Sequence, residues 1–247
     1  EDVAIINCTM EHGHGGVVIG SETSGDIRNV VVSNCVFNGT DRGIRLKTRR
    51  GRGGIVENIR VSNIIMRNVG EALTINMHYW TDTKKEEVSE RTPRFRNIHI
   101  NQITSLNARS AGTIIGLEEM PVDGIRLTDI VLTAQKGMVC KNARNLEFYN
   151  VSVKSNVGPA LTGSNLSQLK LMNLNVRTDD NNAPVIDLKD VKDVHVGDCD
   201  PFTDGHPFMK ISGTAAGEIT VPKRMMEMKN MLHISEKIKK LDIVKGF

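Results

Sequence analysis

Features that define several classes of protein are scarce in this chain. No apolar run approaches the roughly 20 residues that a membrane-spanning helix needs, and aromatic residues make up only 4% of the sequence. Basic and acidic residues nearly balance, at 32 and 29, so the net charge of +3 does not indicate a nucleic-acid partner. Four cysteines in 247 residues are too few for a disulfide framework. We expect these four to be buried free thiols: Cys8, Cys35, Cys140 and Cys199.

A short pattern, in which aliphatic residues alternate with other residues and an Asn or near equivalent follows, recurs along the chain. Its starts are Val3, Val30, Ile59, Ile98, Ile125, Leu146, Leu169 and Val194. The steps between them are 27, 29, 39, 27, 21, 23 and 25 residues. Alternation with period two is the signal of a β-strand. Each unit is too short to bury a face alone, so we expect the units to stack.

Two repeat architectures of short strands compete for this pattern. A propeller blade needs about 40 residues and four strands, and the steps here are too short. The sequence therefore predicts an all-β fold, a single-stranded parallel β-helix of about eight coils, over residues 1–221.

The polar residue that closes each unit falls at one place in the coil. We expect its side chains to form a hydrogen-bonded ladder from coil to coil, interrupted where an acid replaces the amide. The members are Asn7, Asn34, Asn63, Gln102, Asp129, Asn150, Asn173 and Asp198.

Two segments depart from the repeat. The 39-residue step holds a polar insertion, roughly residues 80–93, which predicts a functional wall or a flap. Residues 222–247 carry a stripe of Met225, Met228, Met231 and Leu232 at helical spacing after Pro222. We expect this segment to be a short helical cap on the solenoid; a membrane or partner helix is the alternative interpretation.

Chemistry concentrates near the start of the chain, at Gly13-His14-Gly15 and Arg45-Leu46-Lys47. Arg45 and Lys47 are two residues apart on a strand, so both cations share its outer face. Gly20 falls at the position of Lys47 one coil earlier, which leaves a hollow there. Because coils stack about 4.8 Å apart, His14 and the cations can line one groove. Arg and Lys are suited to bind carboxylates.

Together with the ladder, these two motifs resemble the polygalacturonase-type enzymes, or pectinases, of glycoside hydrolase family 28. The resemblance implies a right-handed β-helix that hydrolyses α-linked galacturonic acid in pectin with inversion, without cofactor or metal. It implies that His14 is catalytic and that Arg45 and Lys47 bind a galacturonate carboxylate. It further implies a secreted or periplasmic protein, with no nucleic-acid or membrane partner.

Further residues are expected at the same groove. Tyr79 and Trp80 stand at the foot of the insertion, where they would stack on sugar rings or form a buried apolar pair. Arg50 extends the basic strip, and Glu22 lies close enough to contact substrate. For Glu22 and Asp41 the alternative is that they are loop charges paired with nearby arginines.

The family's catalytic carboxylates come from an Asn-Thr-Asp motif and an Asp-Asp pair that precede Gly-His-Gly. This resemblance therefore implies an N-terminally truncated member, completed by an upstream partner chain or self-associated through its open first coil. Asp179-Asp180 lies about 29 Å from His14 along the stack and cannot substitute. A catalytically inactive pectin-binding β-helix is the main alternative; a β-helix lyase would want a calcium cluster, which the sequence does not offer near the basic strip.

Overall fold

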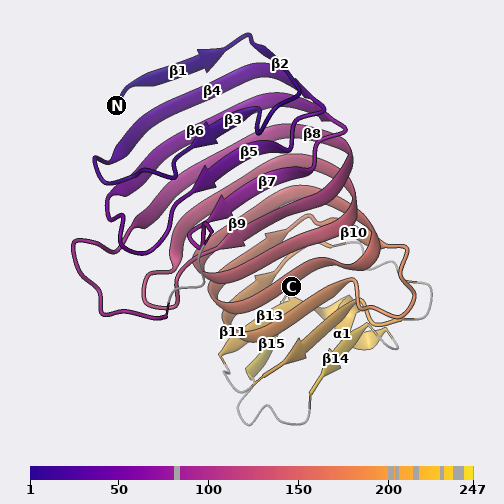
Figure 1. Ribbon diagram of the computed structural model, residues 1–247. Coiled ribbons are helices and arrows are strands. Elements are labelled where there is room, and N and C mark those ends of the chain that lie inside the picture. Colours follow the sequence, from indigo (N-terminus) through magenta and orange to yellow (C-terminus); the bar gives the residue numbers. More distant parts are fainter. Residues whose placement is uncertain are drawn as a thin grey trace.

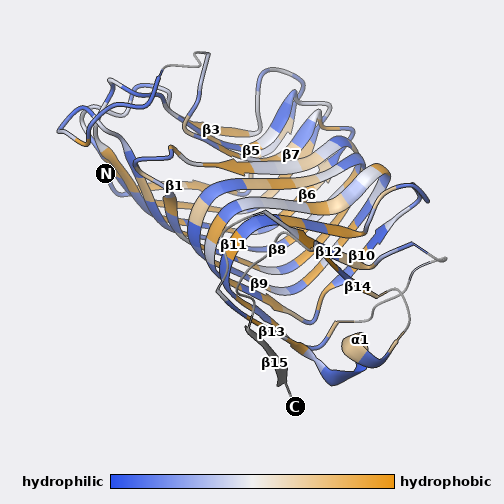
Figure 2. Ribbon diagram, turned by 90° about the horizontal axis from the view of Figure 1, so that it is seen from below, coloured by the Kyte–Doolittle hydropathy of each residue, from blue (hydrophilic) through white to orange (hydrophobic). Residues whose placement is uncertain are grey.

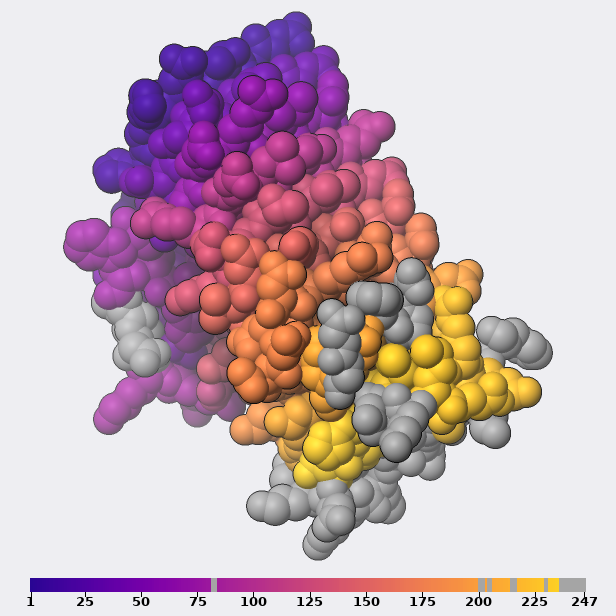
Figure 3. Space-filling model, turned by 90° about the vertical axis from the view of Figure 1, so that its right-hand side faces the viewer, coloured from indigo at the N-terminus to yellow at the C-terminus, as the bar shows by residue number. Residues whose placement is uncertain are grey.

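The computed structural model describes residues 1–80, 84–199, 203, 206–213, 217–228, 231–235 and 242–246. Within these ranges the strands stack in parallel as one right-handed β-helix (Figure 1). The coils follow one another as bands from indigo to yellow (Figure 3). The fold predicted from the repeat is confirmed. The strands are β1 (Val3–Ile6), β2 (Thr9–Glu11), β3 (Val17–Ile19), β4 (Ile27–Asn38), β5 (Arg42–Lys47), β6 (Ile55–Arg67), β7 (Glu71–Asn76), β8 (Arg94–Ile115), β9 (Val122–Met172), β10 (Asn175–Thr178), β11 (Ile186–Val196), β12 (Met209–Ser212), β13 (Glu218–Pro222), β14 (Leu232–Ile234) and β15 (Asp242–Gly246).

The register between coils is the one that the repeat predicts. Val3 pairs with Val30, Val30 with Ile59, Ile59 with Ile98, and Ile98 with Ile125. The last four are fully or almost fully buried, so the aliphatic positions stack into one continuous core. Hydrophobic and hydrophilic residues alternate along the strands, as Figure 2 shows.

The polar ladder forms at the corners of the coil, where the backbone has positive φ. Asn63 donates to Asn34 at 2.8 Å, and Asn34 donates to Asn7 at 3.3 Å. Asn150 donates to Asp129 at 2.6 Å, so an acid continues the ladder on that side rather than interrupting it. Asn tolerates positive φ, and its amide bonds to the next coil, which together explain why it recurs here.

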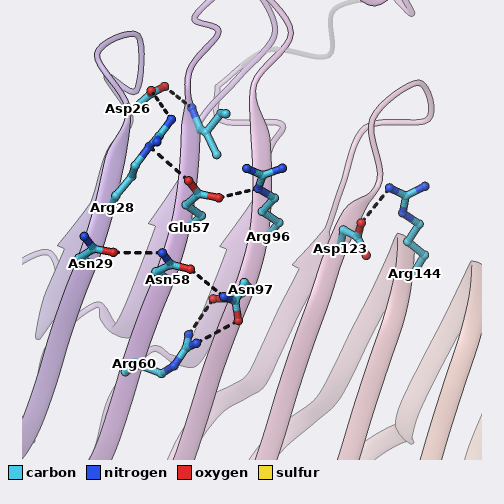
Figure 4. Close-up of polar contacts among 11 residues, drawn as sticks. Asp26, Arg28, Asn29, Glu57, Asn58, Arg60, Arg96, Asn97, Asp123 and Arg144 are labelled. Atoms are coloured by element: carbon cyan, nitrogen blue, oxygen red, sulfur yellow. Dashed lines mark hydrogen bonds and ion pairs between the residues drawn. The ribbon is translucent and has the colours of Figure 1, made fainter.

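A second ladder, which the repeat analysis missed, runs along a neighbouring corner. Asn29 donates to Asp2 at 3.0 Å. Asn58 donates to Asn29 at 3.0 Å and Asn97 donates to Asn58 at 2.7 Å (Figure 4). This ladder fixes the corners that precede the repeat starts Val3, Val30, Ile59 and Ile98.

The C-terminal segment is less helical than the methionine stripe predicts. Helix α1 spans only Lys223–Glu227, and Met228 already has extended backbone. Leu232 instead begins β14, which pairs with β12, so the backbone hydrogen bonds are satisfied by the sheet rather than by a helix. Met225 is fully buried against the core, whereas Met228 is 46% exposed.

The cysteines are free thiols, as expected. Three are buried and Cys8 is half-buried. Burial raises the pKa of Cys140 to about 12, which keeps it a thiol and chemically inert. In the part of the chain that is described, no helix is long and apolar enough to cross a membrane.

Candidate functional site

One wall of the coil is formed by β3, β5 and β7, which pair in that order (Figure 2). Ile44 and Leu46 are buried in the core. Their neighbours Arg45 and Lys47 therefore face outward, as the alternation predicts. Arg45 is in register with Val18 in the coil before and Thr74 in the coil after. The two positions that flank Arg45 in the neighbouring coils are thus an apolar and a small side chain.

Both cations lie over the ring of Tyr79. The Nζ of Lys47 is 4.2 Å from the ring centroid and the Cζ of Arg45 is 5.4 Å away. The backbone N–H of Tyr79 donates to Thr48 O at 2.9 Å, which anchors the ring at the end of β5. Cation–π contacts of this kind are worth about 0.5–1 kcal/mol each at exposed sites. Tyr79 therefore holds the two cations side by side.

His14 is tied to Asp41 across adjacent coils. Its Nδ1 is 2.9 Å from Oδ2 of Asp41, and the side chains are 94% and 55% exposed. The backbone N–H of Asp41 also donates to Gly13 O at 2.8 Å, so the turn that carries His14 is fastened at two points. The hydrogen bond from His14 lowers the pKa of Asp41, which stays ionised and orients the imidazole.

Three glycines that follow His14, namely Gly15, Gly16 and Gly20, lie where packing is close. A Cβ on Gly16 would lie 2.4 Å from the Phe37 ring, and one on Gly15 would lie 2.4 Å from Val18. Gly20 has φ +89°, and a Cβ there would lie 2.0 Å from the carbonyl oxygen of Lys47. These glycines let the first coils pack closely beside the cations.

Comparison with known proteins agrees with this geometry. The model of glycosyl hydrolases family 28 matches residues 1–157, more than half of the chain. The chain belongs to glycosyl hydrolase family 28.

Its relatives include an "Endo-polygalacturonase" from Pectobacterium carotovorum, 31% identical over 143 residues, which are 57% of this chain and 33% of that protein. "Polygalacturonase QRT2" of Arabidopsis thaliana is 27% identical over 66% of this chain and 38% of its own length. "Polygalacturonase-2" of Solanum lycopersicum is 25% identical over 68% and 37%. The matched part of the chain thus spans 33–38% of these relatives' lengths. No solved structure matches.

Arg50, expected to bind substrate, lies elsewhere in this family 28 chain. Its guanidinium bonds Glu119 through Nε at 2.5 Å and Nη2 at 2.9 Å, and both side chains are only 5% exposed. This pair lowers the pKa of Glu119 and raises the pKa of Arg50. The geometry does not support a substrate contact, because the guanidinium is buried in an ion pair that fastens the loop after β5.

Glu22 and Trp80 are both at the surface. Glu22, with its side chain 78% exposed, pairs with Arg52 at 2.6 Å, which is the loop pairing weighed above. Trp80 is 84% exposed, and its ring lies 5.8 Å from that of Tyr79. An exposed indole beside the cations is free to stack on a ligand, and the buried apolar pair is therefore not what forms. Residues 81–83 of the insertion lie outside the described residues.

The Asp179-Asp180 pair has a structural role far along the stack. Asp180 accepts hydrogen bonds from the backbone N–H groups of Gly158 and Asn182, and Asp179 pairs with Lys154 at 3.1 Å. Within the described ranges, no group of three or more His, Cys, Asp or Glu side chains could hold a metal ion.

Proposed function

We propose that this chain forms part of a groove that binds the galacturonate chain of pectin and hydrolyses its α-linkages with inversion. The observation that carries the proposal is the placement of Arg45 and Lys47 together on Tyr79, on the wall next to the His14–Asp41 pair. Galacturonate has a carboxylate on every sugar, which Arg binds with paired hydrogen bonds and Lys as a point charge. Such bonds contribute about 1.5–3 kcal/mol each.

The exposed indole of Trp80 extends this surface with an aromatic face for a neighbouring sugar ring. A polygalacturonate chain lying across β3, β5 and β7 would thus meet cations and aromatic rings in turn. Pectin is a cell-wall polysaccharide, so the proposed activity belongs to a secreted or periplasmic protein.

Inversion requires an acid and a base with carboxyl groups roughly 6.5–9.5 Å apart. Three acids described on or near the wall are engaged: Asp41 with His14, Glu22 with Arg52, and Glu71 with Arg42. We therefore propose that the catalytic carboxylates stand on a further coil stacked over the open end of β1, β2 and β3. In that arrangement His14, oriented by Asp41, assists them.

A second candidate function is a pectin-binding β-helix without catalytic activity. The pairing of Asp41, Glu22 and Glu71 favours it, since a paired carboxylate is a poor proton donor at neutral pH.

Reducing-sugar release from polygalacturonate, with the anomeric form of the first product followed by proton NMR, tests both functions. Release of the inverted anomer, abolished by His14→Ala, supports hydrolysis. Binding without release, weakened by Arg45→Ala, supports the second candidate. If the chain neither binds nor hydrolyses polygalacturonate, both candidate functions are rejected.

A further inference from the structure

A groove of about 410 Å³ opens on a different wall of the coil, between the start of β8 and the start of β9. Between this groove and the wall of Arg45, the coil turns at Gln102 and Asn107, both at positive φ. The groove is therefore separate from the site described above. Its lining residues are Arg96, Asn97, His99, Asp123, Gly124, Ile125, Arg126, Asn145 and Glu147.

The groove lies where the second ladder loses a rung. Gly124 occupies the corner position that Asn97 fills one coil earlier and Asn145 one coil later, and all three have positive φ. With no side chain at Gly124, the floor is hollow. A Cβ there would meet only the backbone of Asn97, at 3.5 and 3.8 Å, so packing does not demand a glycine.

The carboxylates of the groove are already neutralised by neighbours. Asp123 accepts from Arg144 at 2.8 Å and from Asn145 at 2.6 Å. Glu147 accepts from Arg126 at 2.8 Å and from Lys170 at 3.0 Å. Neither acid therefore presents an unpaired negative charge to a ligand.

The cations, in contrast, retain unused donors. Arg96 bonds Glu57 through Nε only, and its two Nη groups have no partner among the described residues (Figure 4). Arg60 donates to Asn97 and to a backbone carbonyl, which leaves its positive charge uncompensated. Three further cations pair with the acids here: Arg126, Arg144 and Lys170. Together with Arg60 and Arg96 they make five cations. The carboxylates are three, Glu57, Asp123 and Glu147, so the net charge of this set is +2.

His99 completes the lining between the cations. It is in register with Arg60 on one side and Arg126 on the other. Burial, followed by the charges of those two arginines, lowers its pKa, so the ring is neutral at neutral pH. A neutral imidazole both donates and accepts, as sugar hydroxyls do. A second hollow of about 390 Å³ shares His99 and Arg126 and adds Asn101, Gln102, Thr128 and Asp129, so polar groups continue along the wall.

We propose that this groove is an accessory site that binds a carboxylate-bearing sugar of an acidic polysaccharide, with the carboxylate on Arg96 beside Gly124. The site goes beyond the proposed function, although the choice of a uronate as its ligand rests on that function. With a second contact on another wall, pectin could bind the molecule at two places. Once the first site is bound, the second binds at a high effective concentration, so the overall affinity rises.

A titration with trigalacturonate, followed by amide NMR on the whole chain, separates the two sites. The single tryptophan, Trp80, reports the Arg45 wall by fluorescence and does not lie in the groove. The chief variant is Gly124→Asn, which supplies the missing rung with a residue that tolerates positive φ and so fills the floor without strain. Arg96→Gln removes the free donors, and Arg94→Gln, an exposed arginine on the same strand outside the groove, is the matched control.

The expected result is amide shifts at residues 96–99 and 123–126 whose dissociation constant rises about tenfold in Gly124→Asn and Arg96→Gln. Arg94→Gln changes it less than twofold, and Trp80 fluorescence titrates alike in all three. A fully methyl-esterified trimer, which lacks the carboxylates, leaves the groove unshifted. Saturable Trp80 quenching without shifts in the groove would overturn the inference and leave the proposed function standing. Groove shifts without Trp80 quenching would overturn the proposed function alone.

Discussion

Tyr79 is the residue on which the binding of both cations depends. Its ring touches Lys47 and Arg45 at once, and two contacts of about 0.5–1 kcal/mol each hold their side chains against the wall. Tyr79→Leu is expected to weaken polygalacturonate binding about tenfold, because both cations must then be ordered at the moment of binding. Affinity electrophoresis in polygalacturonate gels measures the change. Tyr79→Phe keeps the ring and should bind within about twofold of the wild type; an equal loss in both variants would contradict a role for the ring.

Asp41 gives the site a pH dependence whose sign follows from its lowered pKa. The hydrogen bond with His14 is the largest cause of that lowering. A carboxylate with a depressed pKa in the folded state contributes stability above its unfolded pKa, and loses it as pH falls through the folded value. The tie is therefore complete above 3.8, the ordinary pKa of an aspartate side chain, and is lost only at lower pH. A carbon-13 NMR titration of the Asp41 carboxyl should show its midpoint rise toward 3.8 in His14→Ala. An unchanged midpoint would place the cause elsewhere.

The sequence predicted part of this residue-scale picture. Alternation alone placed Arg45 and Lys47 outward, because their neighbours Ile44 and Leu46 must be buried. The His14–Asp41 tie was missed, although the two residues are 27 positions apart, the same step that separates Val3 from Val30. Coil arithmetic would therefore have found it.

The buried ion pair between Arg50 and Glu119 acts at the scale of elements. It joins the loop after β5 to the loop after β8, across the coil that carries β7. Glu119→Ala leaves a buried guanidinium without its carboxylate, which typically costs about 3–5 kcal/mol. Urea unfolding should show that loss, and Trp80 fluorescence should report it early because the loop after β5 also anchors Tyr79 through Thr48.

The double variant Arg50→Met/Glu119→Leu is the control for that pair. Replacing both charges by apolar side chains of similar size is expected to recover most of the lost stability. A double variant as unstable as Glu119→Ala would mean that the attraction between the two charges decides the cost, rather than the burial of a guanidinium that has lost Glu119.

At this scale the periodic elements could be predicted and the loop contacts could not. The strand register follows from the repeat because every inward position obeys one rule. Arg50 and Glu119 lie 69 residues apart across coils of unequal length, so no fixed step connects them. The helix predicted over the methionine stripe is shorter than the stripe for a related reason. A 3.6-residue period describes one face locally, whereas pairing with β12 outweighs it at Leu232.

At the scale of the whole molecule, the first strands of the described residues leave one backbone edge unpaired. β1, β2 and β3 each pair with a strand on one side only, toward β4 and β5. Beside them an apolar hollow of about 320 Å³ is lined by Val3, Ile5 and Met10 among others, and Val3 and Ile6 remain about half exposed, at 46% and 51%. Unpaired parallel edges over exposed apolar residues are what natural sheets usually cover or charge. The apolar side chains along these edges are therefore exposed and available for contact with a second molecule.

Self-association through this end is the corresponding prediction for the chain by itself. Sedimentation velocity should show a weight-average mass that rises with concentration, because stacking the two open ends buries apolar surface at about 25 cal/mol per Å². Val3→Lys puts a charge on the open edge and should hold the chain as a monomer. Val157→Lys, at a residue 57% exposed in the middle of the stack, changes charge equally and should leave association intact. If both the wild type and Val3→Lys are monomers at every concentration, the exposed edge does not drive self-association by itself. The coil proposed to carry the catalytic acids would then have to bind through contacts beyond this apolar surface.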